Sequence, residues 1–247
     1  MARPLAFVNI IVPYHGQYSL VRRCLESLWR NTHGENFQIC LVDDGSEDGG
    51  AFFNSAVRTD RVTGVRLPER RGFGAAVAAG LGQTDQPWVA LVQSDCEAQQ
   101  ISWLAEIRKT MTKLRGDGVK LVVPRTNSVG SGNHSDHVIS RDDEERADHI
   151  ATSPLPLHTF VCHRELFKRI GGNIRSYPLC GYEDEELFYR MKYYGFKQAV
   201  SGRAWIKHEG GKTISEILKK NPAMGDVLDK NRDLCLADIR SLKKQPA

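Results

Sequence analysis

Short apolar segments alternate with segments of helical periodicity along the first half of the chain. The apolar segments, each expected to form a strand, are 7–12, 37–42, 63–67, 88–92 and 120–123. Apolar residues recur at helical spacing in 19–29, where Ser19 is the expected N-cap, and again in 75–81 and 102–114. This alternation is typical of a parallel sheet flanked by helices, and the unbroken apolar runs indicate strands buried on both faces.

A polar segment separates this half from the second. Residues 124–142 are rich in Gly, Ser, Asn and His and have no periodicity, which favours a functional or mobile loop. Beyond it, the pattern predicts a strand at 159–162, helices at 164–170 and 183–194, two strand-like pieces that reach His208, and a helical tail. Glycines that follow each of the two helices are the expected C-caps.

The chain is long enough to bury a sizeable core, because 40% of its 247 residues are hydrophobic. We expect one domain over 1–212, with halves at 1–123 and 124–212, and a C-terminal helical appendage over 213–247. The net charge of +4 suits an anionic ligand but does not demand nucleic acid. Six scattered cysteines without a CxxC pair are expected to be reduced and structural.

No segment is expected to span a membrane. The longest apolar stretches, such as 7–12 and 88–92, are far shorter than the roughly 20 residues that a membrane-spanning helix needs. The first residues show no apolar signal region and no small-residue cleavage site. A cytoplasmic location is therefore the expectation.

Acidic residues and a histidine stand where strands are expected to end or helices to begin. These positions are Asp43-Asp44, Ser94-Asp95-Cys96-Glu97, Glu183-Asp184 and His208. The ends of neighbouring parallel strands meet at one edge of a sheet, so side chains placed there converge on a crevice. We expect the chemistry of the protein at this edge.

Two of these carboxylates have both a chemical and a plain structural interpretation. Asp95, at the end of a buried strand, can hold Mg²⁺ or Mn²⁺, and it can equally cap the loop that follows. Asp184, in the first turn of a predicted helix, can act as a general base, yet the helix dipole favours negative charge there in any protein. A histidine at a strand end, such as His208, is by itself more often structural.

Seven motifs follow one another along most of the chain, from Asn9 to Thr213. They are the segments 10–14, 41–49, 71–76, 94–95, 170–172, 181–184 and 208–213. In this order they resemble the motifs of family 2 glycosyltransferases, which are inverting enzymes with the GT-A fold. The resemblance implies an α/β fold, with one nucleotide-binding Rossmann-like domain, a mixed central sheet and helices on both faces.

The resemblance assigns the nucleotide pocket to the first two strand ends. Pro13 and Tyr14 would line the pocket, and Asp44 would accept a hydrogen bond from the base while Asp43 supports the loop. The first half of the domain would then bind the nucleotide sugar, and the second half would hold the acceptor and the catalytic base. UDP is the expected nucleotide because of the match at Asp44.

Further residues follow from the same resemblance. Gly72 and Gly74 would let the backbone approach the ribose and the diphosphate closely, where a Cβ would obstruct them. Ser94 and Glu183 are also expected to contact the substrate.

The catalytic base and the metal ligands complete the set. Asp184 matches the base that deprotonates the acceptor hydroxyl, and Asp95 and His208 match ligands of a Mn²⁺ or Mg²⁺ ion. Gln93 departs from the family because it occupies the first acidic position of the metal motif. Glu97 is an alternative ligand that would compensate for this loss.

The expected function is transfer of a single sugar from a nucleotide-diphosphate sugar to an acceptor hydroxyl. The acceptor remains open among glycan, lipid-linked intermediate, protein and modified nucleic acid, and association of copies through the C-terminal helices is expected. Because of Gln93, a non-catalytic GT-A-like domain that binds a nucleotide or a protein remains the alternative. A nicotinamide-dependent oxidoreductase is disfavoured, since no Gly-x-Gly-x-x-Gly follows the first strand. A nucleotidyltransferase is disfavoured by the lack of a glycine-rich loop there.

Overall fold

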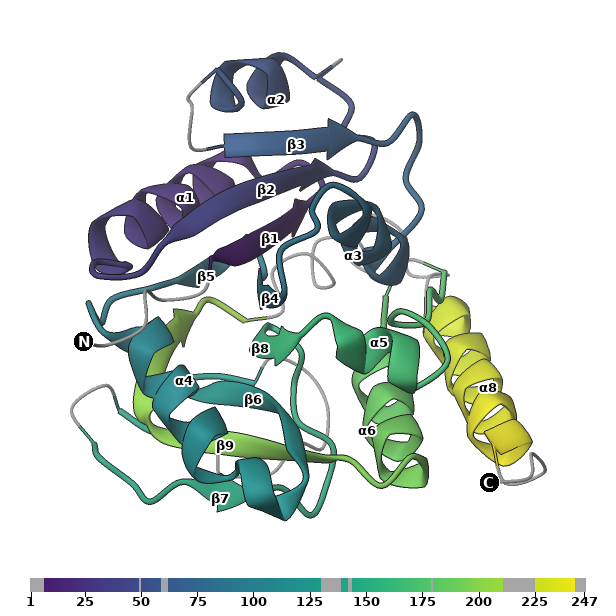
Figure 1. Cartoon of the computed structure of the whole chain (residues 1–247). Coiled ribbons are helices and arrows are strands. Elements are labelled where there is room, and N and C mark those ends of the chain that lie inside the picture. The colour runs from purple at the N-terminus through teal and green to yellow at the C-terminus, as the bar shows by residue number, and fades with distance from the viewer. Residues whose placement is uncertain are drawn as a thin grey trace.

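The strands of this protein form one mixed sheet (Figure 1). The structure, a computed structural model, describes residues 7–48, 50–58, 62–129, 139–141, 144–178, 180–210 and 225–242. Within these residues the strands are β1 (Val8–Tyr14), β2 (Phe37–Asp43), β3 (Val62–Arg66), β4 (Trp88–Val92), β5 (Cys96–Glu97), β6 (Val119–Thr126), β7 (His149–Ile150), β8 (Thr159–His163) and β9 (Lys197–His208). Their order is β3-β2-β1-β4-β8-β6-β9-β5, and β7 pairs with β9.

The direction of the strands changes halfway across the sheet. Strands β3, β2, β1 and β4 run parallel, as the alternating sequence pattern predicts. Strand β8 is antiparallel to both β4 and β6, and β9 runs parallel to β6 and antiparallel to the short β5. Because β8 is antiparallel to β4, its first residue lies beside the last residue of β4.

Helices cover both faces of the sheet. They are α1 (Tyr18–Asn31), α2 (Ala51–Ala56), α3 (Phe73–Gly82), α4 (Trp103–Lys113), α5 (Glu165–Arg169), α6 (Glu183–Tyr193) and α8 (Gly225–Leu242). Apolar residues of α1 and α4 form one core with one face of the sheet, and those of α3, α5 and α6 form a second core with the other face. The sheet is therefore buried between two helical layers, as the unbroken apolar strands indicate.

Most expected elements agree with the structure to within one to three residues at each end. The expected N-cap at Ser19 is wrong, because α1 begins at Tyr18 and Gln17 occupies the capping position in a left-handed conformation. The two strand-like pieces expected before His208 are a single strand, β9. The short elements α2, β5 and β7 were not expected.

The expected boundary between the two halves of the domain, at 123/124, falls inside β6.

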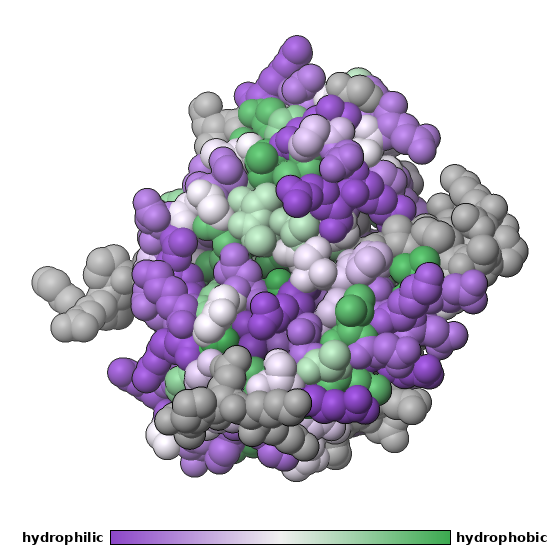
Figure 2. Space-filling model, turned by 90° about the vertical axis from the view of Figure 1, so that its right-hand side faces the viewer, coloured by the Kyte–Doolittle hydropathy of each residue, from purple (hydrophilic) through white to green (hydrophobic). Residues whose placement is uncertain are grey.

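The C-terminal helix α8 packs against α6. Figure 2 faces the side that carries α8, and hydrophilic and hydrophobic residues are mixed there. Leu234 and Leu236 are exposed apolar residues on this helix. Association through it stays a prediction.

The six cysteines are free thiols, and all but Cys180 are buried, as expected for reduced structural residues. No helix among the described residues is both long enough and apolar enough to cross a membrane.

Helix α3 lies close to the sheet because it presents a glycine to it. A Cβ at Gly80 would lie 2.6 Å from Cγ2 of Ile11 on β1. In the same helix, a Cβ at Gly82 would meet no atom within 4 Å. The absence of a side chain at Gly80 thus allows α3 to pack closely on the sheet.

These two glycines give a matched test of the packing. We expect Gly80→Ala to lower the free energy of unfolding by about 1–3 kcal/mol, because overpacking forces the sheet and the helix apart. We expect Gly82→Ala to be neutral or to stabilise by up to about 1 kcal/mol, because alanine favours the helical conformation. Urea unfolding of both variants measures the difference, and equal effects would contradict the packing argument.

Candidate functional site

The carboxyl ends of β1, β2 and β4 meet at one edge of the sheet, and most of the candidate residues lie there. Tyr14 ends β1 beside Asp43, which ends β2, and Pro13 pairs with Val42 in the same register. Strand β4 ends at Val92, and the turn that carries Ser94 and Asp95 follows. The parallel topology therefore gathers the expected nucleotide and metal residues on one edge.

Asp43 is a fully buried carboxylate that organises the loop after β2. Its Oδ1 accepts a hydrogen bond from the amide of Ser46 at 2.9 Å, and its Oδ2 accepts one from Nε of Arg66 at 2.9 Å. Arg66 also donates to the carbonyl of Ser46 at 2.8 Å. The ion pair compensates the burial of the charge, and these contacts let Asp43 hold the loop after β2.

Asp44 holds a second loop against the first. Its two carboxylate oxygens accept hydrogen bonds from the backbone amides of Arg71, at 2.7 Å, and Gly72, at 2.9 Å. Its own carbonyl oxygen lies 2.8 Å from Nδ1 of His15. Asp44 thus joins the ends of β1 and β2 to the loop before α3. A nucleobase that donated a hydrogen bond to Asp44 would share a carboxylate oxygen that already accepts a hydrogen bond from a backbone amide.

The structure requires a glycine at positions 72 and 74 for two different reasons. Gly72 has φ +89° at the start of α3, a conformation that favours glycine. A Cβ at Gly74 would lie 2.0 Å from the carbonyl oxygen of Arg175, so packing against this segment is a further reason for a glycine here. The missing Cβ of Gly74 makes room for the segment before α6, and its role toward a nucleotide stays a prediction.

Aromatic rings line the start of the site. Tyr14 packs edge-on against Phe52, with ring centroids 5.7 Å apart, and Tyr18 stacks on Phe52 at 5.1 Å. Burial, followed by the negative charges of Asp43 and Asp48, raises the pKa of Tyr14, which keeps the phenol protonated. The phenol is therefore neutral, and its hydroxyl oxygen is buried at this edge.

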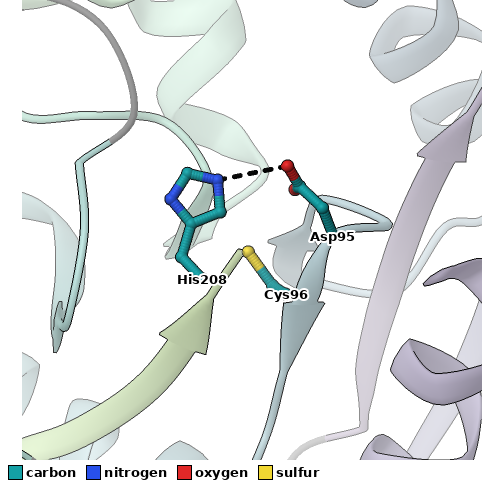
Figure 3. A group of neighbouring side chains, drawn as sticks. All are labelled: Asp95, Cys96 and His208. Carbon is teal, nitrogen blue, oxygen red and sulfur yellow. Dashed lines mark ion pairs between the residues drawn. The ribbon is translucent and has the colours of Figure 1, made fainter. Parts of the chain in front are cut away.

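Asp95 and His208 face each other across the β5–β9 pair (Figure 3). Antiparallel pairing sets Cys96 opposite His208, and this register brings Nε2 of His208 to 3.4 Å from Oδ2 of Asp95. Both residues are nearly buried. The structure thus brings together the two side chains that the family resemblance predicts as metal ligands.

The other ring nitrogen of His208 has a partner of its own. Nδ1 lies 2.9 Å from the carbonyl oxygen of Ser128, which can only accept, so Nδ1 carries the proton of this hydrogen bond. Burial lowers the pKa of His208, but the hydrogen bond and charge of Asp95 outweigh it and the net pKa is raised. The ring is therefore oriented with Nε2 toward Asp95.

Cys96 is the third residue whose ligand atom lies within 4.8 Å of the others in this cluster. Burial, and then the charge of Asp95, raise its pKa well above the ordinary value, which opposes formation of the thiolate that binds metals. Its Sγ lies 3.7 Å from the carbonyl oxygen of His158. Cys96 is thus a weaker candidate than its two neighbours.

Three polar residues near Asp95 lie outside the cluster of possible metal ligands. Glu97, the alternative ligand, pairs with Arg23 at 3.3 Å and Lys207 at 3.5 Å. The backbone amide of Gln93 donates a hydrogen bond to the carbonyl oxygen of His158 at 2.8 Å. Ser94 lies half-buried in the turn between β4 and β5. The cluster therefore does not include Glu97.

His158 was missed by the sequence analysis. It is buried directly before β8, and its ring centroid lies 4.7 Å from that of His208. Its place in the site follows from the antiparallel pairing of β8 with β4, which has no signal in the sequence. The contact of His15 with the carbonyl of Asp44 likewise has no signal in the sequence.

Glu183 and Asp184 begin α6, as the sequence predicts. Oε2 of Glu183 accepts a hydrogen bond from the amide of Gly181, and burial raises the pKa of this carboxyl to about 8. Asp184 is half-buried, and its Oδ1 accepts a hydrogen bond from the amide of Glu185 at 3.0 Å. The two adjacent carboxyls therefore have different surroundings, and burial favours the protonated form of Glu183 near neutral pH.

The fold has counterparts in known proteins. The model of the family described as Glycosyl transferase family 2 matches residues 9–171. This chain belongs to that family. Solved structures give the same fold: GalNAc-T7 with UDP, GalNAc and Mn²⁺ aligns with a TM-score of 0.66 at 17% identity, covering 84% of this chain and 45% of that one. S. aureus TarS 1-349 gives 0.60 at 16%, covering 81% and 60%. The expected GT-A fold is thereby confirmed.

Curated relatives of this family 2 chain are longer than it is. Glycosyltransferase AglE of Haloferax volcanii is 27% identical over 125 residues, which are 49% of this chain and 40% of that protein. Succinoglycan biosynthesis protein ExoO of Rhizobium meliloti is 24% identical over 161 residues, 65% of this chain and 43% of that protein. The chain spans less than half the length of these two relatives.

The raised pKa of Glu183 predicts a pH dependence of stability. Between about pH 4.5 and pH 8 the folded protein keeps a proton on this carboxyl that the unfolded chain has released. The folded state thus binds more protons in this window, so its stability falls as the pH rises toward 8. We expect Glu183→Gln to flatten this slope, by up to about 1.4 kcal/mol per pH unit. Urea unfolding across this window measures it, and equal slopes would show that folded Glu183 is ionised.

Proposed function

We propose that this family 2 glycosyltransferase moves a single sugar from a UDP-sugar to an acceptor hydroxyl, with inversion at the anomeric carbon. The observation that carries the proposal is the pair formed by Asp95 and His208 at the edge where β1, β2 and β4 end. Two metal-ligand side chains at the nucleotide edge of a GT-A fold suit a metal bound to a diphosphate.

The residues present fit a divalent metal. The oxygen of Asp95 and Nε2 of His208 lie close together and face each other, and the carbonyl of Ser128 fixes the imidazole from behind, which is the usual support of a metal-bound histidine. A bound ion would neutralise the charge of the leaving diphosphate. The nitrogen ligand favours Mn²⁺ over Mg²⁺, because Mg²⁺ is a hard cation that prefers oxygen ligands. The structure of GalNAc-T7 with Mn²⁺ agrees with this choice of metal.

The nucleotide pocket is proposed at the ends of β1 and β2, lined by Pro13 and Tyr14. Asp44 would accept a hydrogen bond from the base, and the backbone amides around Gly72 lie in the loop that Asp44 holds. The choice of UDP is supported by the structure of GalNAc-T7 with UDP. We further propose that Ser94, Glu183 and Gly74 lie within reach of the donor.

Asp184 is the proposed general base. It would take the proton of the acceptor hydroxyl while that oxygen attacks the anomeric carbon and the bond to the diphosphate breaks. Glu183 is unsuited to this step, because a carboxyl with a pKa of about 8 already carries a proton at neutral pH. The half-buried, neighbouring Asp184 is the better base.

The acceptor is proposed to be a glycan, since one relative is named for succinoglycan biosynthesis. Protein, lipid-linked and nucleic-acid acceptors are the other outcomes of an acceptor screen. A domain that binds nucleotides without turnover is the second candidate, and the glutamine at position 93 favours it. The cytoplasmic location stays a prediction from the sequence.

The metal site gives the first test. We expect Mn²⁺ to tighten UDP binding more than Mg²⁺ does, and we expect Asp95→Ala and His208→Ala to weaken the Mn²⁺-dependent binding by about 10- to 100-fold. Cys96→Ser is the matched control, because it keeps the hydrogen bond to His158 and is expected to retain Mn²⁺ binding. Calorimetry with UDP and each metal measures this. Loss of Mn²⁺ binding in the Cys96 variant would make the thiol a third ligand.

The base gives the second test. UDP release from a panel of UDP-, GDP- and TDP-sugars with Mn²⁺ identifies the donor. We expect Asp184→Asn to lower kcat by about 10²- to 10⁴-fold and to leave UDP affinity unchanged. Glu185→Gln, the next acid on the same helical turn, is the control and should remain active. Binding without turnover in the wild type would support the non-catalytic alternative.

A further inference from the structure

One face of α8 packs against the turn that leads into α6. Residues spaced by three and four positions share a side of a helix. On α8 these residues are Leu228, Asn231, Cys235, Asp238 and Leu242. The first four each contact the segment 177–182, and the fifth is buried. The helix therefore presents a continuous face to the residues that precede Asp184.

Asn231 is the polar centre of this face, and it is fully buried. Its Nδ2 donates to the carbonyl oxygens of Pro178, at 2.8 Å, and Cys180, at 3.0 Å. A buried amide is costly unless it forms hydrogen bonds, so an apolar side chain would be the cheaper filler at this position. Asn231 therefore fixes the course of the backbone immediately before Gly181.

The turn that follows is strained. Gly181 has φ +107°, and Tyr182, which is not a glycine, has φ +74°. Such a residue costs about 1–3 kcal/mol and persists only when its surroundings hold it. Helix α8 supplies two of these surroundings: Sγ of Cys235 lies 3.6 Å from the carbonyl oxygen of Tyr182, and Leu228 lies against Gly181.

We propose that α8, through Asn231, positions Asp184 for proton transfer. Asp184 is the second residue of α6, so the direction of its side chain depends on where the helix starts, and the turn over 181–182 sets that start. Asn231 is a positioning residue that acts through Asp184 and does not touch the substrate. The inference rests on the proposed function.

The docking of α8 has anchors besides Asn231. The hydroxyl of Tyr177 donates to Oδ2 of Asp238 at 2.9 Å, and Leu242 is buried at the end of the helix. Replacing Asn231 should therefore loosen the turn without releasing the helix. Lys230, the exposed neighbour on α8, offers a matched control.

The kinetic test measures UDP release from the best UDP-sugar with Mn²⁺. We expect Asn231→Ala to lower kcat by about 10- to 100-fold, with KM and UDP affinity changed by less than about threefold, because a shift near 1 Å misplaces the base. Lys230→Ala should match the wild type. In the Asp184→Asn background, Asn231→Ala should cause no further loss, since the two residues act as a unit. Equal multiplicative losses in both backgrounds, or a parallel loss of UDP binding, would overturn the proposal.

A second measurement does not depend on activity. Hydrogen exchange should quicken at the amides of 180–186 in Asn231→Ala and stay as in the wild type in Lys230→Ala. Should Asn231→Ala fail to fold, Leu228→Ala removes the contact with Gly181 and should act in the same direction. Unchanged exchange over 180–186 would overturn the positioning role even in an active enzyme. A wild type that releases no UDP from any donor would instead defeat the proposed function, while the exchange result would still show whether α8 holds the turn.

Discussion

The pairing of Cys96 with His208 is the contact on which the candidate site depends. Strand β5 has only two residues, so it contributes little stability by itself, and it is held by β9 and by the hydrogen bond from the amide of Glu209 to the carbonyl of Asp95 at 3.0 Å. Asn127 pairs with both the amide and the carbonyl of His208. The last residue of β9 is thereby fixed from two sides. Without this register, a carboxylate from the first half of the chain and an imidazole from near its end would not meet.

Backbone contacts join the edge proposed for the nucleotide to the segment that leads to the proposed base, Asp184. Asp44 ties the loop before α3 to the end of β2, and Gly74 at the start of α3 packs on the carbonyl of Arg175. The hydroxyl of Ser176 donates to the carbonyl of Arg71 at 3.2 Å in the same region. Because these contacts involve main-chain atoms, the two parts of the site cannot shift independently by much.

The sequence predicts the elements that carry a strong periodic signal, and it predicts contacts poorly. Strands such as β4 and helices such as α6 agree with the structure within one residue, because apolar runs and three-to-four spacing directly reflect burial. A two-residue strand such as β5 has no period to detect. The expected N-cap of α1 at Ser19 was also wrong, because a serine near a helix start is only a local preference, and Gln17 takes the capping position instead.

The site residues likewise fall into those that a local sequence pattern predicts and those that only the tertiary structure brings to the site. The acidic pairs were found because they stand at predicted element ends, whereas His158 enters the site only through the antiparallel direction of β8, which no local pattern encodes.

The parts of the site that complete it lie beyond the region that defines the family. The match to the family model ends at Gly171, so it includes Asp44 and Asp95 but neither α6 nor the end of β9. These later elements carry the proposed base Asp184 and the proposed metal ligand His208, and each needs a support of its own. For His208 that support is Asn127, and for the turn before Asp184 it is Asn231. In each case a side-chain amide fixes main-chain groups rather than a ligand, and that of Asn231 is fully buried. A rigid backbone is what a metal ligand and a base require, because both act only at a defined distance from the reacting atoms.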